Sequence, residues 1–286
     1  MTMSFTRGSV RNALPLVPFF IFLLIFLIIP TVSVVNGSIS QDGSYSLDKL
    51  AALSDGAAMG ALLKSVLLSA VTAVIGAVLG AVLAWLIVSS PSTSVFRRVV
   101  TSICSVLAQF GGVALAFAFI ATIGYSGVLT AWSKSVGGPD LYGTGWLYSV
   151  TGLILVYTYF QIPLMVIVFL PALEGLRVQW REAAVSLGAT SRQYWTQVAG
   201  PLLAPAFLGA TLLLFANAFA AYATAAALVS QGNPILPLMI RTALTSEVVL
   251  GQAGFAYALA FEMIIVVAII MVGYGLLVRR TSRWLQ

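Results

Sequence analysis

The sequence predicts an all-α protein that crosses a membrane about six times. Of its 286 residues, 60% are hydrophobic and only 8% are charged, whereas about a quarter of the residues of a soluble protein are charged. The mean hydropathy is +1.04. The apolar residues gather in runs of about 20 or more, which is the length that a helix needs to cross a hydrocarbon core of ~30 Å. Short polar segments separate these runs.

We expect a single transmembrane domain over residues 1–286. Its spans are predicted at about 14–35, 61–88, 99–123, 148–172, 206–229 and 253–278. The first run follows Arg7 and Arg11, as a signal peptide would. We interpret it as a retained span, because it is long enough to cross the bilayer and no small-residue cleavage pattern follows it.

The second and third spans carry local packing signals. Gly76 and Gly80 form a GxxxG pattern, which lets two helix backbones approach closely in lipid. We expect it to serve packing within the chain, and a seam between two copies is the alternative. In the third span, Gln109 stands beside Gly111 and Gly112, which predicts a local break in the helix.

Composition excludes several function classes. The chain has no histidine and one cysteine, Cys104, within an apolar run. It therefore has no histidine-based triad or metal site and no internal disulfide, and Cys104 is expected to be a packing residue. We expect no metal and no nucleic acid as ligands. The sequence also has no phosphate-binding loop of the G-x-x-x-x-G-K-[ST] type.

The most polar stretch between two spans covers residues 174–205. Residues 181–187 contain good helix formers and no breaker, and Gly188 follows where a helix C-terminus favours glycine. Thr190 or Ser191 can then cap a second helix. Charged groups inside a bilayer cost several kcal/mol, so we expect a structured aqueous loop with a helix, a glycine corner and a second helix. An ordinary amphipathic interfacial helix is the alternative.

The spacing within this loop resembles a family motif. Glu182, Ala183, Ala184, Gly188 and Pro201 stand at the spacing of the EAA loop of ABC importer permeases. Two positions depart from that pattern: Val198 replaces isoleucine, which is conservative, and Gly200 replaces leucine, which is not. The layout of the spans resembles the same family over most of the chain, and the fifth span with the stretch that follows it looks most similar to the MetI-like, polyamine-type branch.

The resemblance implies a role for the loop and a set of partners. It implies a coupling helix that docks a separate cytoplasmic ATP-binding subunit, which uses the ATP, while this chain binds no cofactor. A second permease subunit, the same chain or a different one, and an extracytoplasmic solute-binding protein complete the assembly in the lipid bilayer. The alternative for Ala183 and Ala184 is packing against this chain's own helices. The implied docking residues are Arg181, Glu182, Ala183, Ala184, Leu187, Gly188 and Pro201.

Basic residues predict the orientation. With the 174–205 loop inside, the inner segments hold 10 of the 14 lysines and arginines and the outer segments hold 4. This agrees with the positive-inside rule. We therefore expect a multi-pass protein with both termini in the cytoplasm, and the family resemblance implies that its membrane is the plasma (inner) membrane of a prokaryote. Three outer segments, 36–55, 124–147 and 230–252, are candidates for contact with the binding protein, or are plain connectors.

Polar residues inside the spans are the candidates for the translocation path, because such groups face a cavity or a partner helix. Gln109 and Asn217 can equally be hydrogen-bonding residues between helices. Glu262 can line a path for a cationic solute, or pair with a neighbouring helix. From the family branch we expect a polyamine, a phosphonate, iron or a similar solute more than a sugar. The candidates are Gln109, Tyr157, Gln161, Asn217, Tyr222 and Glu262.

Three rival functions remain for such a chain. A secondary transporter coupled to an ion gradient would need an intramembrane acid, and Glu262 is the residue that fits. A membrane-embedded enzyme is poorly supported, because histidine is absent and acids are few. A passive channel would leave the loop at 174–205 without a purpose.

Overall fold

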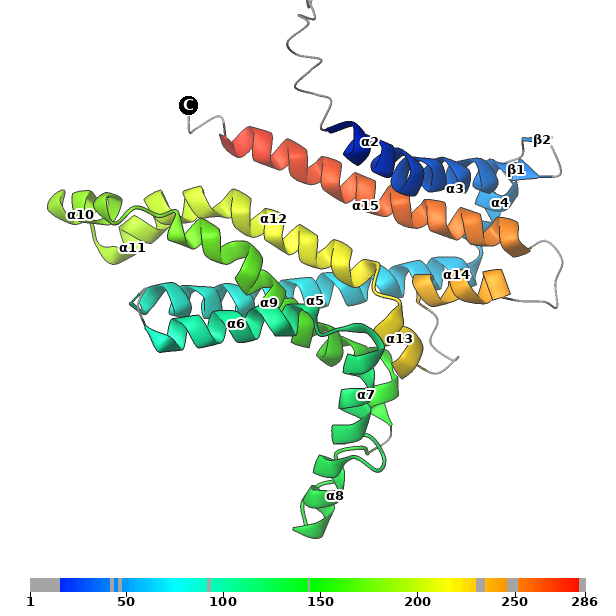
Figure 1. The fold of residues 1–286 in the computed structure, drawn as a ribbon, viewed down its shortest axis with the longest axis horizontal. Coiled ribbons are helices and arrows are strands. Elements are labelled where there is room, and N and C mark those ends of the chain that lie inside the picture. Colours follow the sequence, from blue (N-terminus) through cyan, green and yellow to red (C-terminus); the bar gives the residue numbers. More distant parts are fainter. Residues whose placement is uncertain are drawn as a thin grey trace, which may run out of the picture. The chain divides into compact units, whose positions relative to one another are not determined.

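The computed structural model describes residues 16–41, 44–45, 48–91, 94–143, 145–229, 235–245 and 252–282. Apart from one two-stranded ribbon, the regular structure of these residues is helical (Figure 1). Six segments of the described chain are apolar and long enough to cross a bilayer, which confirms the predicted all-α polytopic membrane fold. They are Val17–Ile39, Gly56–Ser89, Gly112–Ser135, Val150–Glu174, Ser191–Phe219 and Gly254–Leu276.

The chain divides into two compact units, which are described separately. The first comprises Met1–Met59 and Met239–Ile265, and the second comprises Gly60–Leu238 and Val266–Gln286. This division into compact units does not test the expected single permease domain over 1–286, which stays a prediction.

The first unit holds the first span and the beginning of the last one. Helix α2 (Val17–Leu23) continues through a π-helical turn into α3 (Ile29–Ile39), so this span ends later than the predicted residue 35. Strands β1 (Ser40–Gln41) and β2 (Ser44–Tyr45) and helix α4 (Asp48–Ala51) follow. Lys49 donates to the carbonyl of Ser40 and fixes this turn against the end of α3.

The second unit is built around α9 (Val150–Glu174). Helices α5 (Gly56–Ser89) and α12 (Gly200–Phe219) pack against it. At Gly76 an added Cβ would lie 2.5 Å from the Cβ of Gln161, and at Gly80 an added Cβ would lie 2.5 Å from that of Met165. The glycines therefore let α5 meet α9, which confirms that the GxxxG pattern packs within the chain.

The predicted third span, 99–123, is two helices. Helix α6 (Val95–Gln109) ends at Phe110, and α7 (Gly112–Ile123) begins after Gly111, so the break predicted beside Gln109 is confirmed. Helix α8 (Val128–Ser135) continues the chain. Helices α6 and α7 both pack against α9.

A second break lies in the predicted fifth span, 206–229. Helix α12 ends at Phe219, and the short α13 (Ala223–Leu228) follows after three residues outside any helix. The continuous span predicted there is wrong, because the helix is interrupted over Ala220, Ala221 and Tyr222. Helix α14 (Leu236–Thr245) follows, and α15 (Gln252–Ser282) is the last span.

The core of the second unit lies where the two breaks meet α9. Tyr157 and Phe219 are among its largest fully buried side chains. Helix α13 packs against α7, which places the two interrupted spans side by side (Figure 1). The buried apolar cluster contains Leu68, Leu115, Ala116, Leu147, Leu153, Val156, Tyr157, Phe160, Ala218, Ala225, Leu228 and Ile235.

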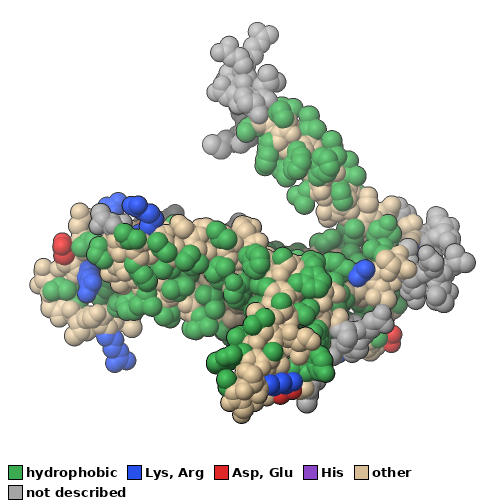
Figure 2. Space-filling model, turned by 60° about the horizontal axis from the view of Figure 1, so that its bottom comes forward, with side chains coloured by type: hydrophobic (Ala, Val, Ile, Leu, Met, Phe, Trp, Pro, Cys, Tyr) green, Lys and Arg blue, Asp and Glu red, His purple; other side chains and the backbone are tan. Residues whose placement is uncertain are grey.

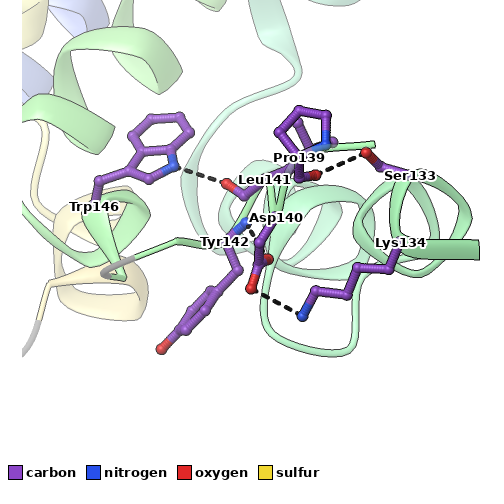
Figure 3. A network of polar contacts seen from close by, with 7 residues as sticks. All are labelled: Ser133, Lys134, Pro139, Asp140, Leu141, Tyr142 and Trp146. Carbon is purple, nitrogen blue, oxygen red and sulfur yellow. Dashed lines mark hydrogen bonds and ion pairs between the residues drawn. The ribbon is translucent and has the colours of Figure 1, made fainter. Parts of the chain in front are cut away.

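The segment predicted as an outer loop, 124–147, is partly helical and internally bonded (Figure 3). Ser133 donates to the carbonyl of Pro139 at 2.7 Å, and the Trp146 indole donates to that of Leu141 at 2.8 Å. Lys134 forms an ion pair with Asp140 at 2.9 Å. The hydrogen bond that Lys134 donates within this ion pair holds the pKa of the Asp140 carboxyl below its usual value. The hydrogen bond from the backbone N–H of Tyr142 lowers that pKa as well.

Candidate docking loop and translocation path

The polar loop between the fourth and fifth spans has the predicted helix–corner–helix form. Helix α10 (Val178–Ser186) ends at Leu187, and Gly188 follows with φ of +78°. The Gly188 N–H donates to the carbonyl of Val185, and the Ala189 N–H donates to that of Ala184. Glycine suits this corner because a Cβ disfavours left-handed backbone.

The second helix begins at a capping box. The Thr190 hydroxyl accepts from the Gln193 backbone N–H, and the Gln193 side chain accepts from the Thr190 N–H at 2.7 Å. Helix α11 (Ser191–Tyr194) passes through a π-helical turn, Trp195–Ala199, directly into α12. The loop predicted over 174–205 is therefore shorter, and Pro201 lies inside the apolar segment Ser191–Phe219, two residues after the π-helical turn.

Helix α10 carries apolar side chains that nothing in the described chain covers. No residue of α10 is buried, and Val185 and Leu187 are 64% and 88% exposed. Ala183 is also exposed and Ala184 half-buried. Packing against this chain's own helices therefore does not account for Ala183, so this face of α10 is free for a partner.

Two of the implied docking residues are charged and stand on the same exposed helix. Arg181 and Glu182 are both exposed and line a cavity of about 330 Å³ with Val185 and Ser186. Figure 2 shows basic side chains gathered at the end of the molecule that carries α10 and α11 in Figure 1. A surface with charged and apolar groups together is suited to docking another protein.

Two of the six predicted path residues are buried contacts between helices. The Tyr157 hydroxyl donates to the carbonyl of Ala221 at 2.6 Å, and the Gln161 amide donates to that of Leu214 at 2.9 Å. Both side chains are fully buried in the second unit. They join α9 to α12 and to the break after it, so they act here as hydrogen-bonding residues between helices.

Three other predicted path residues gather at the helix breaks. Asn217 and Tyr222 line a cavity of about 290 Å³ with Ala108, Gly111 and other residues. Gln109 is exposed and lies between two residues that line this cavity. The Thr224 hydroxyl donates to the carbonyl of Gly112 at 3.2 Å and joins the two breaks.

The sixth, Glu262, belongs to the first unit, whereas the other five belong to the second. Its side chain is half-buried, and its Oε2 atom has no hydrogen-bond partner among the described residues. Within the described chain, no group of three or more His, Cys, Asp or Glu side chains is placed to hold a metal ion.

Sequence reasoning did not find a polar cluster at the other end of α6. Arg97 forms an ion pair with Glu174, the last residue of α9. A cavity of about 310 Å³ opens there, lined by Arg97, Arg98, Thr101, Ser102, Leu170 and Glu174. The signal in the sequence is the recurrence of polar residues every three or four positions from Arg98 to Gln109.

Comparison with solved structures identifies the fold. A chain of the crystal structure of a bacterial ABC transporter involved in the import of the acidic polysaccharide alginate is similar with a TM-score of 0.77 and 18% identity, over 96% of each chain. A chain of that kind of transporter in complex with an alginate pentasaccharide-bound periplasmic protein gives a TM-score of 0.76 and 18% identity, again over 96% of each chain.

A chain of the MetNI methionine ABC transporter in an inward-facing conformation is similar with a TM-score of 0.59 and 17% identity. The match covers 79% of this chain and 99% of that one. No protein-family model matches the sequence, and no curated protein does. At these identities, the structural likeness establishes that this chain has a fold found in ABC importers.

Proposed function

We propose that this chain is the transmembrane permease subunit of an ATP-driven importer, with α10 as the helix that receives a cytoplasmic ATP-binding subunit. The observation that carries the proposal is the exposed α10, held at a rigid glycine corner between two spans and presenting uncovered apolar side chains. The similarity of the fold to chains of two ABC importers supports it.

The proposed mechanism is a rigid-body switch. ATP-driven closure of two ATP-binding subunits moves two α10 helices together, and each helix transmits the motion through the short α11 and its π-helical turn into α12. Such a change requires contacts that differ between two states. ATP is bound and hydrolysed by the partner, and this chain supplies the path.

The proposed assembly and orientation follow from the resemblance of the loop. It comprises a second permease subunit, an extracytoplasmic solute-binding protein and the ATP-binding subunits, in a prokaryotic plasma membrane with both termini inside. The solute is a small hydrophilic molecule. The branch resemblance favours a polyamine, a phosphonate or iron over a sugar, whereas the similar solved structures are transporters of alginate and of methionine.

The test is co-purification of an ATP-binding subunit encoded beside this chain. We expect wild type to retain the subunit and Glu182→Arg to lose most of it, because the substitution reverses a charge on the exposed docking face. Ser135→Arg on α8 is the matched control, since it introduces the same side chain at another exposed helical position. Retention by Glu182→Arg, or loss by both variants, would contradict the docking role.

The second candidate function is an ion-coupled secondary transporter. The buried, unpartnered Oε2 atom of Glu262 favours it. Transport that continues without any ATP-binding subunit, and that Glu262→Gln abolishes, would identify this class instead.

A further inference from the structure

Helix α6 has two different exposed faces. At about 100° per residue, one face gathers Val95, Val99, Ile103 and Val106, which are 72%, 48%, 50% and 67% exposed. A neighbouring face gathers Arg98, Ser102, Ser105 and Gln109, which are also exposed. We name these four residues the polar stripe of α6. Cys104 lies on neither face and is only 4% exposed.

Helix α6 lies alongside a membrane span. At one end Arg97 pairs with Glu174, the last residue of α9. At the other end Ala108 and Gly111 share a cavity with Phe160 of the same helix. The two points are 14 residues apart on α9, which corresponds to about 21 Å at 1.5 Å per residue. The stripe itself runs along α6 from Arg98 to Gln109, which corresponds to about 16 Å or roughly half of a hydrocarbon core of ~30 Å.

Hydrocarbon is a poor environment for this stripe. The Ser105 hydroxyl donates a hydrogen bond to the carbonyl of Thr101 at 2.9 Å. A serine bonded in this way tolerates contact with lipid. Gln109 carries an amide at the inner end of the stripe, and Arg98 carries a charge that forms no ion pair with any described residue. Polar groups at this depth face a water-filled cavity or a protein partner.

Both ends of the stripe open into cavities. The cavity of about 310 Å³ beside Arg98 and Ser102 lies at the end of α9 from which the docking loop starts. The cavity of about 290 Å³ lies next to Gln109 at the helix breaks, and Asn217 and Tyr222 line it. The stripe joins the two cavities along one helix face.

We propose that the polar stripe of α6 is a water-facing wall of the solute path, and that this wall favours anionic and neutral solutes over cations. The charge on it is positive, because the Glu174 carboxylate is engaged by Arg97 and the stripe itself contains no acid. Hydroxyls and an amide supply the remaining groups. This inference rests on the proposed import function and narrows it: of the solutes favoured there, the wall fits a phosphonate and disfavours a polyamine or an iron cation.

Thiol labelling tests the inference without knowledge of the solute. Cys104 is the chain's single cysteine, so Cys104→Ala gives a cysteine-free background. Ser102→Cys and Ser105→Cys then place a thiol on the stripe with little change in volume, and Ile103→Cys and Val106→Cys place one on the apolar face. The full chain, in inside-out membrane vesicles, is treated with membrane-impermeant anionic and cationic methanethiosulfonates.

We expect both stripe cysteines to react and both apolar-face cysteines to stay unmodified until the membrane is dissolved. A single positive charge about 8 Å away in water changes the relative rates of the anionic and cationic reagents by roughly fivefold, so Ser102→Cys should prefer the anionic reagent by about that factor after correction for intrinsic reactivity. Arg98→Gln should remove most of the preference, and Arg98→Lys should keep it.

Three results would overturn the inference. Stripe cysteines that react no faster than apolar-face cysteines would show that the stripe is covered by lipid or by a second subunit. A preference for the cationic reagent, or a preference that Arg98→Gln leaves unchanged, would remove the charge selectivity. Because labelling requires no ATP-binding subunit, it can fail while co-purification succeeds, and the reverse also holds.

Discussion

The contact between α5 and α9 at Gly80 allows a quantitative prediction. An alanine Cβ at this position would lie 2.5 Å from the Cβ of Met165 and 2.7 Å from the carbonyl oxygen of Ile162. Carbon atoms prefer separations of about 3.5–4.0 Å, and one of the two neighbours is backbone, so a side-chain rotation cannot relieve the overlap. Gly80→Ala should therefore push the two helices apart, at a cost of about 1–3 kcal/mol.

Gly60→Ala in the same helix is the matched control. No atom lies within 4 Å of the Cβ that it would add, and it shares the gain of about 1 kcal/mol in helix propensity. The difference between the two variants isolates the overlap. At roughly 2–4 °C per kcal/mol, Gly80→Ala should melt about 2–12 °C below Gly60→Ala when the full chain is heated in detergent. Equal melting temperatures would show that α5 and α9 are not in close contact there.

Three further predictions follow from local geometry. Tyr157→Phe should destabilise the chain by about 1–3 kcal/mol, measured by thermal unfolding, because the buried carbonyl of Ala221 loses its donor; an unchanged melting temperature would contradict this hydrogen bond. Gly188→Ala should cost about 1–2 kcal/mol at a φ of +78° and weaken retention of the ATP-binding subunit, and retention at wild-type levels would argue against a rigid corner. Asp140 has a depressed pKa, so its stabilising contact with Lys134 is fully present above the ordinary aspartate pKa and is lost as the pH falls through the lower pKa of the folded state. Lys134→Met should raise the titration midpoint of Asp140, measured by carboxyl NMR, toward the ordinary value. An unchanged midpoint would contradict the contact between Lys134 and Asp140.

The elements that sequence predicted well depend on few residues. The corner at Gly188, the cap at Thr190 and the break beside Gln109 are each specified by neighbours in the chain, so turn and cap chemistry is sufficient to find them. The close approach at Gly76 is a tertiary contact, but its requirement for a small residue is visible in the sequence.

The elements that sequence missed depend on distant residues. The break at Ala221 lies among good helix formers without glycine or proline, and its carbonyl is held by Tyr157, which is 64 positions away. Tyr157 and Gln161 are polar and intramembrane, as path residues are, and only the packing shows that both point into the core. The ion pair between Arg97 and Glu174 also joins distant residues, 77 positions apart, so the sequence does not show it.

The loop between α10 and α12 specifies its own shape. Its corner and its cap are formed by residues 183–193, and the hydrogen bonds that hold them join neighbours in the sequence. The exposed Val185 and Leu187 take no part in the packing of the spans. Substitutions at these exposed positions can therefore change the surface of α10 while the hydrogen bonds of the corner and the cap, and the packing of the spans, stay the same.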